Sequence, residues 1–172
     1  MSDDDGLEVA PEPDAATEST ATIEASASVG PTGDPDAPVF RVMNVESVLF
    51  DLSDPSPMIH MVEAEVPFRY LPIPIALAEA QALHNALLGV EGRRPTTHEL
   101  LSAMLARLNC DVIAVRIVRY EGGVFYAELD VMSPRGRETF DARPSDAIII
   151  ATRQLVAAPV LCAEAVFAEF FD

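Results

Sequence analysis

The sequence predicts an α+β domain with a mostly antiparallel sheet and three to four helices. Three strand patterns follow one another at Val112–Tyr120, Val124–Val131 and Arg137–Ala142, and tight turns separate them at Glu121–Val124 and Ser133–Gly136. This succession is typical of an antiparallel meander. Over the whole chain, antiparallel pairs outnumber the crossovers that parallel strands would need, which favours the α+β class.

Composition divides the chain into two parts. Residues 1–38 hold ten of the 28 acidic residues and none of the 11 basic ones, and they are rich in Ala, Pro, Ser and Thr. Such a segment buries too little apolar surface to offset the entropy of an ordered chain. We therefore expect a disordered acidic N-terminal tail over 1–38 and a single domain over 39–172, which is long enough for its own core.

The charge balance limits the partners of this chain. Its formal net charge is −17, and all 11 basic residues are arginines. An acidic protein is a poor electrostatic match to bulk nucleic acid, which leaves a local arginine patch or a metal-bridged contact as the routes to binding. No apolar run approaches the roughly 20 residues of a membrane span, and no signal-peptide pattern is present. We expect a cytoplasmic protein that makes no membrane contact.

Three strands are expected in the first half of the domain. Val42–Asp51 and Met58–Glu65 have strand composition and flank a turn at residues 53–57 that is rich in Ser, Asp and Pro. Arg69–Ala76 is also extended, but its two prolines cannot donate to a hydrogen-bond ladder. This third strand is therefore expected at an edge of the sheet.

Two helices are expected to follow. Leu77–Leu88 has helical spacing of apolar residues and ends at a glycine. Thr96 and Glu99 have the spacing of a capping box, which predicts the start of the next helix. That helix is expected to bury four apolar side chains, namely Leu101, Met104, Leu105 and Leu108.

Charge is concentrated at the junction between the last meander strand and an almost wholly apolar helix. Arg143 precedes a proline, so it is expected to be extended at the N-cap, and Pro144 fits the first helical position. Asp146 then falls in the first turn, where the helix dipole favours a carboxylate. Residues 147–155 are apolar almost all round and should be buried. A short strand at Val160–Cys162 and a helix at Ala163–Phe171 complete the chain.

The turn at Pro134–Arg135 sets a register in which Glu128 lies opposite Asp141. Facing carboxylates about 5 Å apart repel unless a cation or a proton lies between them. Arg143, Arg137 or a divalent metal would supply that charge. An arginine bridge is the simpler interpretation, because arginine is plentiful nearby.

Two interpretations remain for the charged junction. Arg143 bridging Asp141 and Asp146 would fix the strand to the helix as a buried polar clamp without chemistry. The same three groups, set close together, would equally suit a functional site.

A second charged group lies at the start of the preceding helix. Arg93 and Arg94 precede His98 and Glu99, which fall in its first turn. One interpretation is a capped surface helix behind a basic loop, and the other is an anion-binding site at the helix N-terminus.

Three segments of the sequence resemble the bifunctional nuclease family. They are Leu71–Ala80 (LPIPIALAEA), Arg94–Leu101 (RPTTHELL), and Phe125–Ala127 (FYA) followed by Asp141–Ala147 (DARPSDA). Ala76 stands where the family pattern has glycine, and Glu99 where it has aspartate. The resemblance implies an α+β domain that forms a homo-oligomer, with a dimer favoured. It also implies a nuclease that acts on both DNA and RNA.

The resemblance and the carboxylate cluster together give a hypothesis for the site. Phosphodiester hydrolysis would be assisted by Mg²⁺ or Mn²⁺, and no standard nuclease or metal-binding motif is present to specify the ion. The expected catalytic residues are Glu128, Asp141 and Asp146, as metal ligands or bases, and Arg143, which would stabilise phosphate charge. The expected substrate-binding residues are Arg93, Arg94, His98 and Glu99. The alternative is a non-catalytic regulatory or scaffold oligomer whose Asp/Arg cluster is a structural clamp.

Overall fold

Seven strands form one sheet and four helices flank it in the part of the chain that the computed structural model describes, residues 37–49 and 56–171. Residues 1–36 of the expected tail and most of the expected turn at 53–57 lie outside these residues. The elements are β1 (Phe40–Leu49), β2 (Met58–Glu63), β3 (Tyr70–Pro74), α1 (Leu77–Leu87), α2 (Thr97–Arg107), β4 (Asp111–Glu121), β5 (Val124–Ser133), β6 (Gly136–Ala142), α3 (Pro144–Thr152), β7 (Val160–Ala163) and α4 (Glu164–Phe171). The predicted α+β class is confirmed.

The strand order is β3-β2-β1-β7-β4-β5-β6. Two antiparallel meanders, β1–β3 and β4–β6, meet on either side of the short strand β7. This strand pairs antiparallel with β1 and parallel with β4. The expected edge position of the proline-containing strand is correct, because β3 is the outermost strand of its meander.

The predicted register of the last hairpin is also confirmed. Glu128 lies opposite Asp141 in the β5–β6 ladder. The preceding turn joins β4 to β5 through Gly122 and Gly123, whose φ angles of 59° and 84° are in the left-handed region that favours glycine. These two turns fix which side chains of β5 face the helices.

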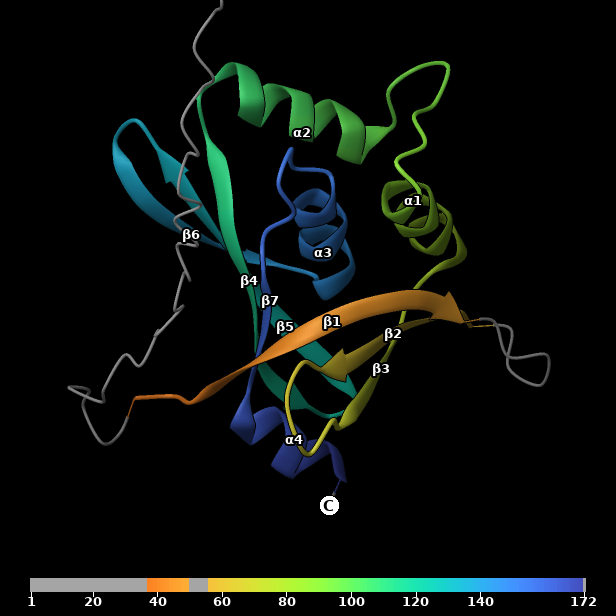
Figure 1. Cartoon of the computed structure of the whole chain (residues 1–172), viewed down its shortest axis with the longest axis vertical. Helices are drawn as coiled ribbons and strands as arrows, with labels where there is room; N and C mark the ends of the chain where they lie inside the picture. The colour runs from red at the N-terminus through yellow and green to blue at the C-terminus, as the bar shows by residue number, and fades with distance from the viewer. Residues whose placement is uncertain (1–36, 50–55, 172) are drawn as a thin grey trace, which may run out of the picture. The chain divides into compact units, whose positions relative to one another are not determined.

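The apolar core lies between the sheet and the helices α1, α3 and α4. Helix α3 is buried almost all round, and its Ile148 and Ile149 are fully inaccessible. The expected burial of residues 147–155 is wrong at its end, because the helix stops at Thr152 and Leu155 is fully exposed. Figure 1 shows α1, α2 and α3 grouped near one end of the sheet and α4 near the opposite end. The three grouped helices enclose the candidate site.

The expected burial of four apolar side chains by helix α2 is wrong for three of them. Of the side chains that it was expected to bury, Leu101, Met104 and Leu108 are 38%, 49% and 61% exposed, and only Leu105 packs partly against the core. No residue of α2 is fully buried. Apolar spacing shows which residues share a helix face, but not whether another element covers that face.

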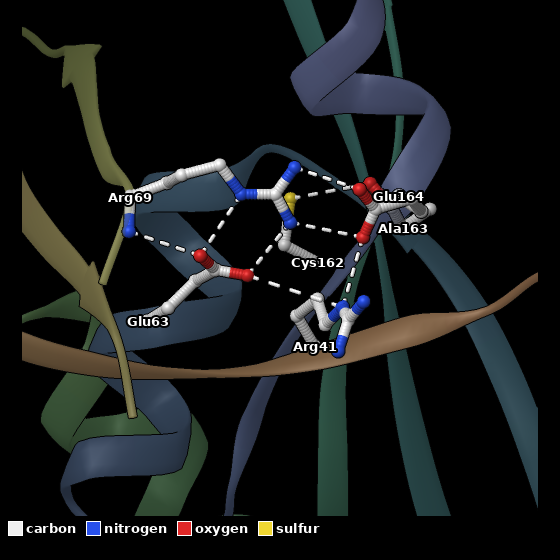
Figure 2. A network of polar contacts seen from close by, with 6 residues as sticks. All are labelled: Arg41, Glu63, Arg69, Cys162, Ala163 and Glu164. Atoms are coloured by element: carbon white, nitrogen blue, oxygen red, sulfur yellow. Dashed lines mark hydrogen bonds and ion pairs between the residues drawn. The ribbon is translucent and has the colours of Figure 1, made fainter. Parts of the chain in front are cut away.

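A polar network secures the region where β7 passes into α4 (Figure 2). The Arg69 guanidinium lies 2.7 Å from the carboxylate of Glu63 and 2.7 Å from that of Glu164. Arg41 of β1 donates to Glu164 as well, at 2.8 Å. Hydrogen bonds from the two arginines lower the pKa of Glu164 to about 2. The network therefore links β1, the β2–β3 connection and the start of α4.

Arg69→Ala tests whether this network stabilises the fold. The substitution leaves the Glu63 side chain, which is only 3% exposed, without its main cation. Breaking such a buried pair from one side is strongly destabilising, so we expect a loss of about 3 kcal/mol in the free energy of unfolding, measured with urea. Arg119→Ala is the control, because Arg119 and Glu121 form a pair that is 53% and 65% exposed. That control should cost less than about 1 kcal/mol, and equal losses would contradict the prediction.

Candidate functional site

A cavity of about 900 Å³ lies between α1, α2, α3 and the strands β5 and β6. Most of its wall is apolar and includes Ala82, Leu101, Leu105, Leu129, Val131 and Phe140. Its polar lining includes Glu79, His98, Asp141, Arg143 and Asp146. Its volume and its mixed lining are typical of pockets for small ligands. The cavity therefore brings four of the eight predicted site residues to one place, namely His98, Asp141, Arg143 and Asp146.

Asp146 is the centre of the polar lining. It lies in the first turn of α3, after Arg143 at the N-cap (φ −70°, ψ 143°) and Pro144 at the helix start, as the sequence predicted. Arg143 Nε donates to Asp146 Oδ2 at 2.8 Å. His98 Nε2, from the first turn of α2, lies 2.9 Å from Asp146 Oδ1. One carboxylate thus joins α2 to α3.

Arg143 has a second partner, Glu79 of α1, with which its guanidinium forms an ion pair. The Glu79 side chain is 11% exposed, and its Oε2 also accepts the backbone N–H of Ala76 at 2.9 Å, which caps α1. Sequence reasoning missed Glu79 as a site residue. The available signal was a carboxylate on the buried side of an apolar helix, which requires a partner.

The ionisation of Asp146 determines the role of His98. Burial raises the pKa of Asp146, but hydrogen bonds from Arg143 and His98 outweigh it and hold that pKa below its ordinary value. An ionised carboxylate only accepts hydrogen bonds, so His98 Nε2 carries the shared hydrogen. In the neutral ring, Nδ1 is then the acceptor, and no residue of the described ranges bonds to it. The pair has the form of an oriented general base.

Glu128 does not join this cavity. Its neighbour Leu129 faces the cavity, so alternation along β5 directs Glu128 to the other face of the sheet. There Arg116 of β4 lies 2.8 Å from Glu128 and also bonds Asp130, whose pKa falls to about 2. The expected arginine bridge between Glu128 and Asp141 is not found among the described residues, because Arg116 of β4 pairs Glu128 with Asp130 instead. Arg137 instead lies 2.6 Å from Asp130.

Arg143 forms the expected clamp with Asp146, but its second carboxylate is Glu79 and not Asp141. Arg143 binds Asp146 and Glu79, and Asp141 makes no ion pair within residues 37–49 and 56–171. Glu128, Asp141 and Asp146 do not gather into a ligand set. Across the described ranges, no group of three or more His, Cys, Asp or Glu side chains is arranged to hold a metal ion. Assistance by Mg²⁺ or Mn²⁺ stays a prediction, because Mg²⁺ is often held by one or two carboxylates together with substrate phosphates.

The remaining predicted residues lie outside the cavity. The Glu99 carboxylate accepts the backbone N–H of Thr96 at 2.6 Å, which confirms the predicted cap, and lies 3.1 Å from Arg153. Arg93 and Arg94 are exposed in the loop between α1 and α2, and neither lines the cavity. Among the expected substrate-binding residues, only His98 reaches the cavity.

Fold and site together define an α+β domain with a histidine–aspartate–arginine centre at an apolar cavity. Comparison with known families matches residues 61–170 to the bifunctional nuclease domain, and the chain belongs to that family. The matched region contains all three helices of the cavity. No helix in the described part of the chain is both long and apolar enough to cross a membrane.

Two curated relatives come from Mycobacterium tuberculosis, one from strain CDC 1551 / Oshkosh and one from strain H37Rv, and both are named as uncharacterized proteins. Each is 43% identical to this chain over 101 residues, which is 59% of this chain. The match spans 58% of the length of each relative.

Arg143→Ala tests the clamp. Because Arg143 joins Glu79 to Asp146 but is itself 65% exposed, we expect a loss of about 1–2 kcal/mol in the free energy of unfolding. Urea denaturation measures it, with Arg93→Ala as the control in an exposed loop. A variant as stable as the wild type would show that the ion pairs of Arg143 do not hold the helices.

Proposed function

We propose that this protein is a nuclease that hydrolyses phosphodiester bonds in DNA and RNA, with His98, Asp146 and Arg143 as its active centre. Membership of the bifunctional nuclease domain family supports the reaction class. The observation that carries the choice of residues is the hydrogen bond between His98 Nε2 and the ionised Asp146 at the cavity wall. Fold alone does not determine chemistry, so the proposal depends on this geometry.

In the proposed mechanism, His98 Nδ1 accepts a proton from the water molecule that attacks the phosphorus atom, the P–O bond to the leaving oxygen breaks, and that oxygen takes a proton from solvent. Asp146 keeps the imidazole in the required tautomer and stabilises the imidazolium that forms. The Arg143 guanidinium, which is 65% exposed, stabilises the charge that develops on the phosphate oxygens. Asp141 borders the same cavity, but it lies opposite Glu128 in the β5–β6 ladder, so its side chain points to the other face of the sheet and no step is assigned to it. No step is assigned to Glu128 or to a metal ion.

Cleavage assays on the purified full chain test this proposal. Single- and double-stranded DNA and RNA are supplied with Mg²⁺, with Mn²⁺, or with EDTA. We expect cleavage by the wild type and a decrease of at least about a hundredfold in the rate constant of Asp146→Asn, because His98 loses its charged partner. Glu91→Gln changes an exposed carboxylate and is the matched control.

Equal cleavage by the wild type and Asp146→Asn would indicate a contaminating nuclease and contradict the proposal. No cleavage in any arm would favour the second candidate function, a non-catalytic scaffold. One observation favours that alternative, namely that both carboxylates next to Arg143 are satisfied by its guanidinium. In such a protein the charged group would only hold α1 against α3.

We also propose that the protein is a homodimer and that the outer face of α2 forms its interface. Leu100, Met104 and Leu108 are 53%, 49% and 61% exposed on neighbouring turns of this helix. Their spacing of four residues places them on one side of the helix, where exposed apolar side chains favour an interaction site.

Sedimentation velocity on the full chain measures the oligomeric state. We expect a dimer for the wild type and a monomer for Met104→Glu. Leu155→Glu changes a fully exposed leucine outside α2 and should remain a dimer. A monomeric wild type at about 100 μM would contradict the interface, because stable dimers have dissociation constants far below that concentration.

A further inference from the structure

The cavity has an aromatic wall that the proposed chemistry does not use. Phe140 of β6 lines the cavity and is 49% exposed, and it lies opposite Leu129 in the β5–β6 ladder. Leu101 and Leu105 of α2 lie on the same cavity lining. An aromatic ring that is left half-exposed beside aliphatic side chains provides a surface on which a planar ring can stack.

The size of the cavity exceeds what a phosphate group requires. A volume of about 900 Å³ accommodates a ligand of one or two rings, together with the groups attached to them. Aliphatic walls offer no hydrogen bonds to phosphate oxygens. The free energy that they contribute comes from removing the apolar or aromatic surface of a ligand from water.

Local charge also opposes binding through phosphates alone. Arg143 is the cation of the polar lining, and Glu79 and Asp146 place two carboxylates beside it. The whole chain carries a net charge of −17. A duplex presents dense phosphate charge, and its bases are stacked and paired. It therefore has no free base to place in this apolar cavity.

We propose that the substrate of this site is single-stranded nucleic acid, with one unpaired base stacked on Phe140 inside the cavity. This inference rests on the proposed nuclease function and specifies its substrate. The phosphate next to the seated base lies at His98 and Arg143, and base burial supplies most of the affinity. Because only one or two phosphates contact the protein, affinity depends weakly on salt.

Fluorescence anisotropy of the full chain with labelled eight-nucleotide phosphorothioate oligomers tests the proposal. The probes are oligothymidylate, oligouridylate, an abasic oligomer of equal length, and a duplex. Both single strands with bases should bind about tenfold or more tightly than the abasic strand and the duplex, since stacking on one aromatic ring is worth this much. Between 50 and 200 mM salt the affinity should change less than about tenfold.

Phe140→Leu isolates the stacking surface. It should weaken binding of oligothymidylate about tenfold, and its control Phe171→Leu, at a 58% exposed position outside the cavity, should change binding less than about twofold. Equal binding of the abasic strand or of the duplex, or an unchanged Phe140→Leu variant, would overturn the inference.

The two proposals fail in different ways. Cleavage of single strands and duplexes at equal rates, unaffected by Phe140→Leu, would leave the nuclease function and overturn the base-binding cavity. Base-dependent binding without any cleavage would support the cavity and overturn the nuclease function.

Discussion

The arrangement of three helices depends on the carboxylate of Asp146. It binds His98 of α2 directly, and through Arg143 it is connected to Glu79 of α1. Helix α2 has no fully buried residue, so polar contacts near its start carry much of its attachment to the rest of the domain. The His98–Asp146 hydrogen bond and the pair of Glu99 with Arg153 are two of these. The cavity beneath α2 persists because these contacts hold the helix in place.

A structural clamp and a catalytic centre are compatible in this geometry. The same hydrogen bond that attaches α2 to α3 also selects the tautomer of His98, because an ionised Asp146 can only accept and Nε2 must therefore carry the hydrogen. The ion pair with Arg143 keeps that carboxylate charged. Rigidity of the first turn of α3 therefore serves both the stability of the helices and the orientation of the proposed base.

Local sequence rules predicted the elements whose geometry is set by neighbours in the chain. Pro144 restricts Arg143 to an extended N-cap, and the turn before β6 fixes the register that sets Glu128 opposite Asp141. Contacts between distant segments were not predictable in this way. Bulges in β4 on either side of Arg116 obscure its alignment with Glu128, so its ion pair is not evident from residue spacing. The Arg143–Glu79 pair and the insertion of β7 between the meanders likewise depend on how separate elements pack.

The most direct test is a double-mutant cycle for phosphodiester cleavage with His98→Gln, Asp146→Asn and the double variant. If Asp146 acts through the imidazole, each single variant is slow and the double variant cleaves no more slowly than His98→Gln alone. If the two losses multiply, Asp146 and His98 act independently, and the hydrogen bond between them is not the basis of catalysis.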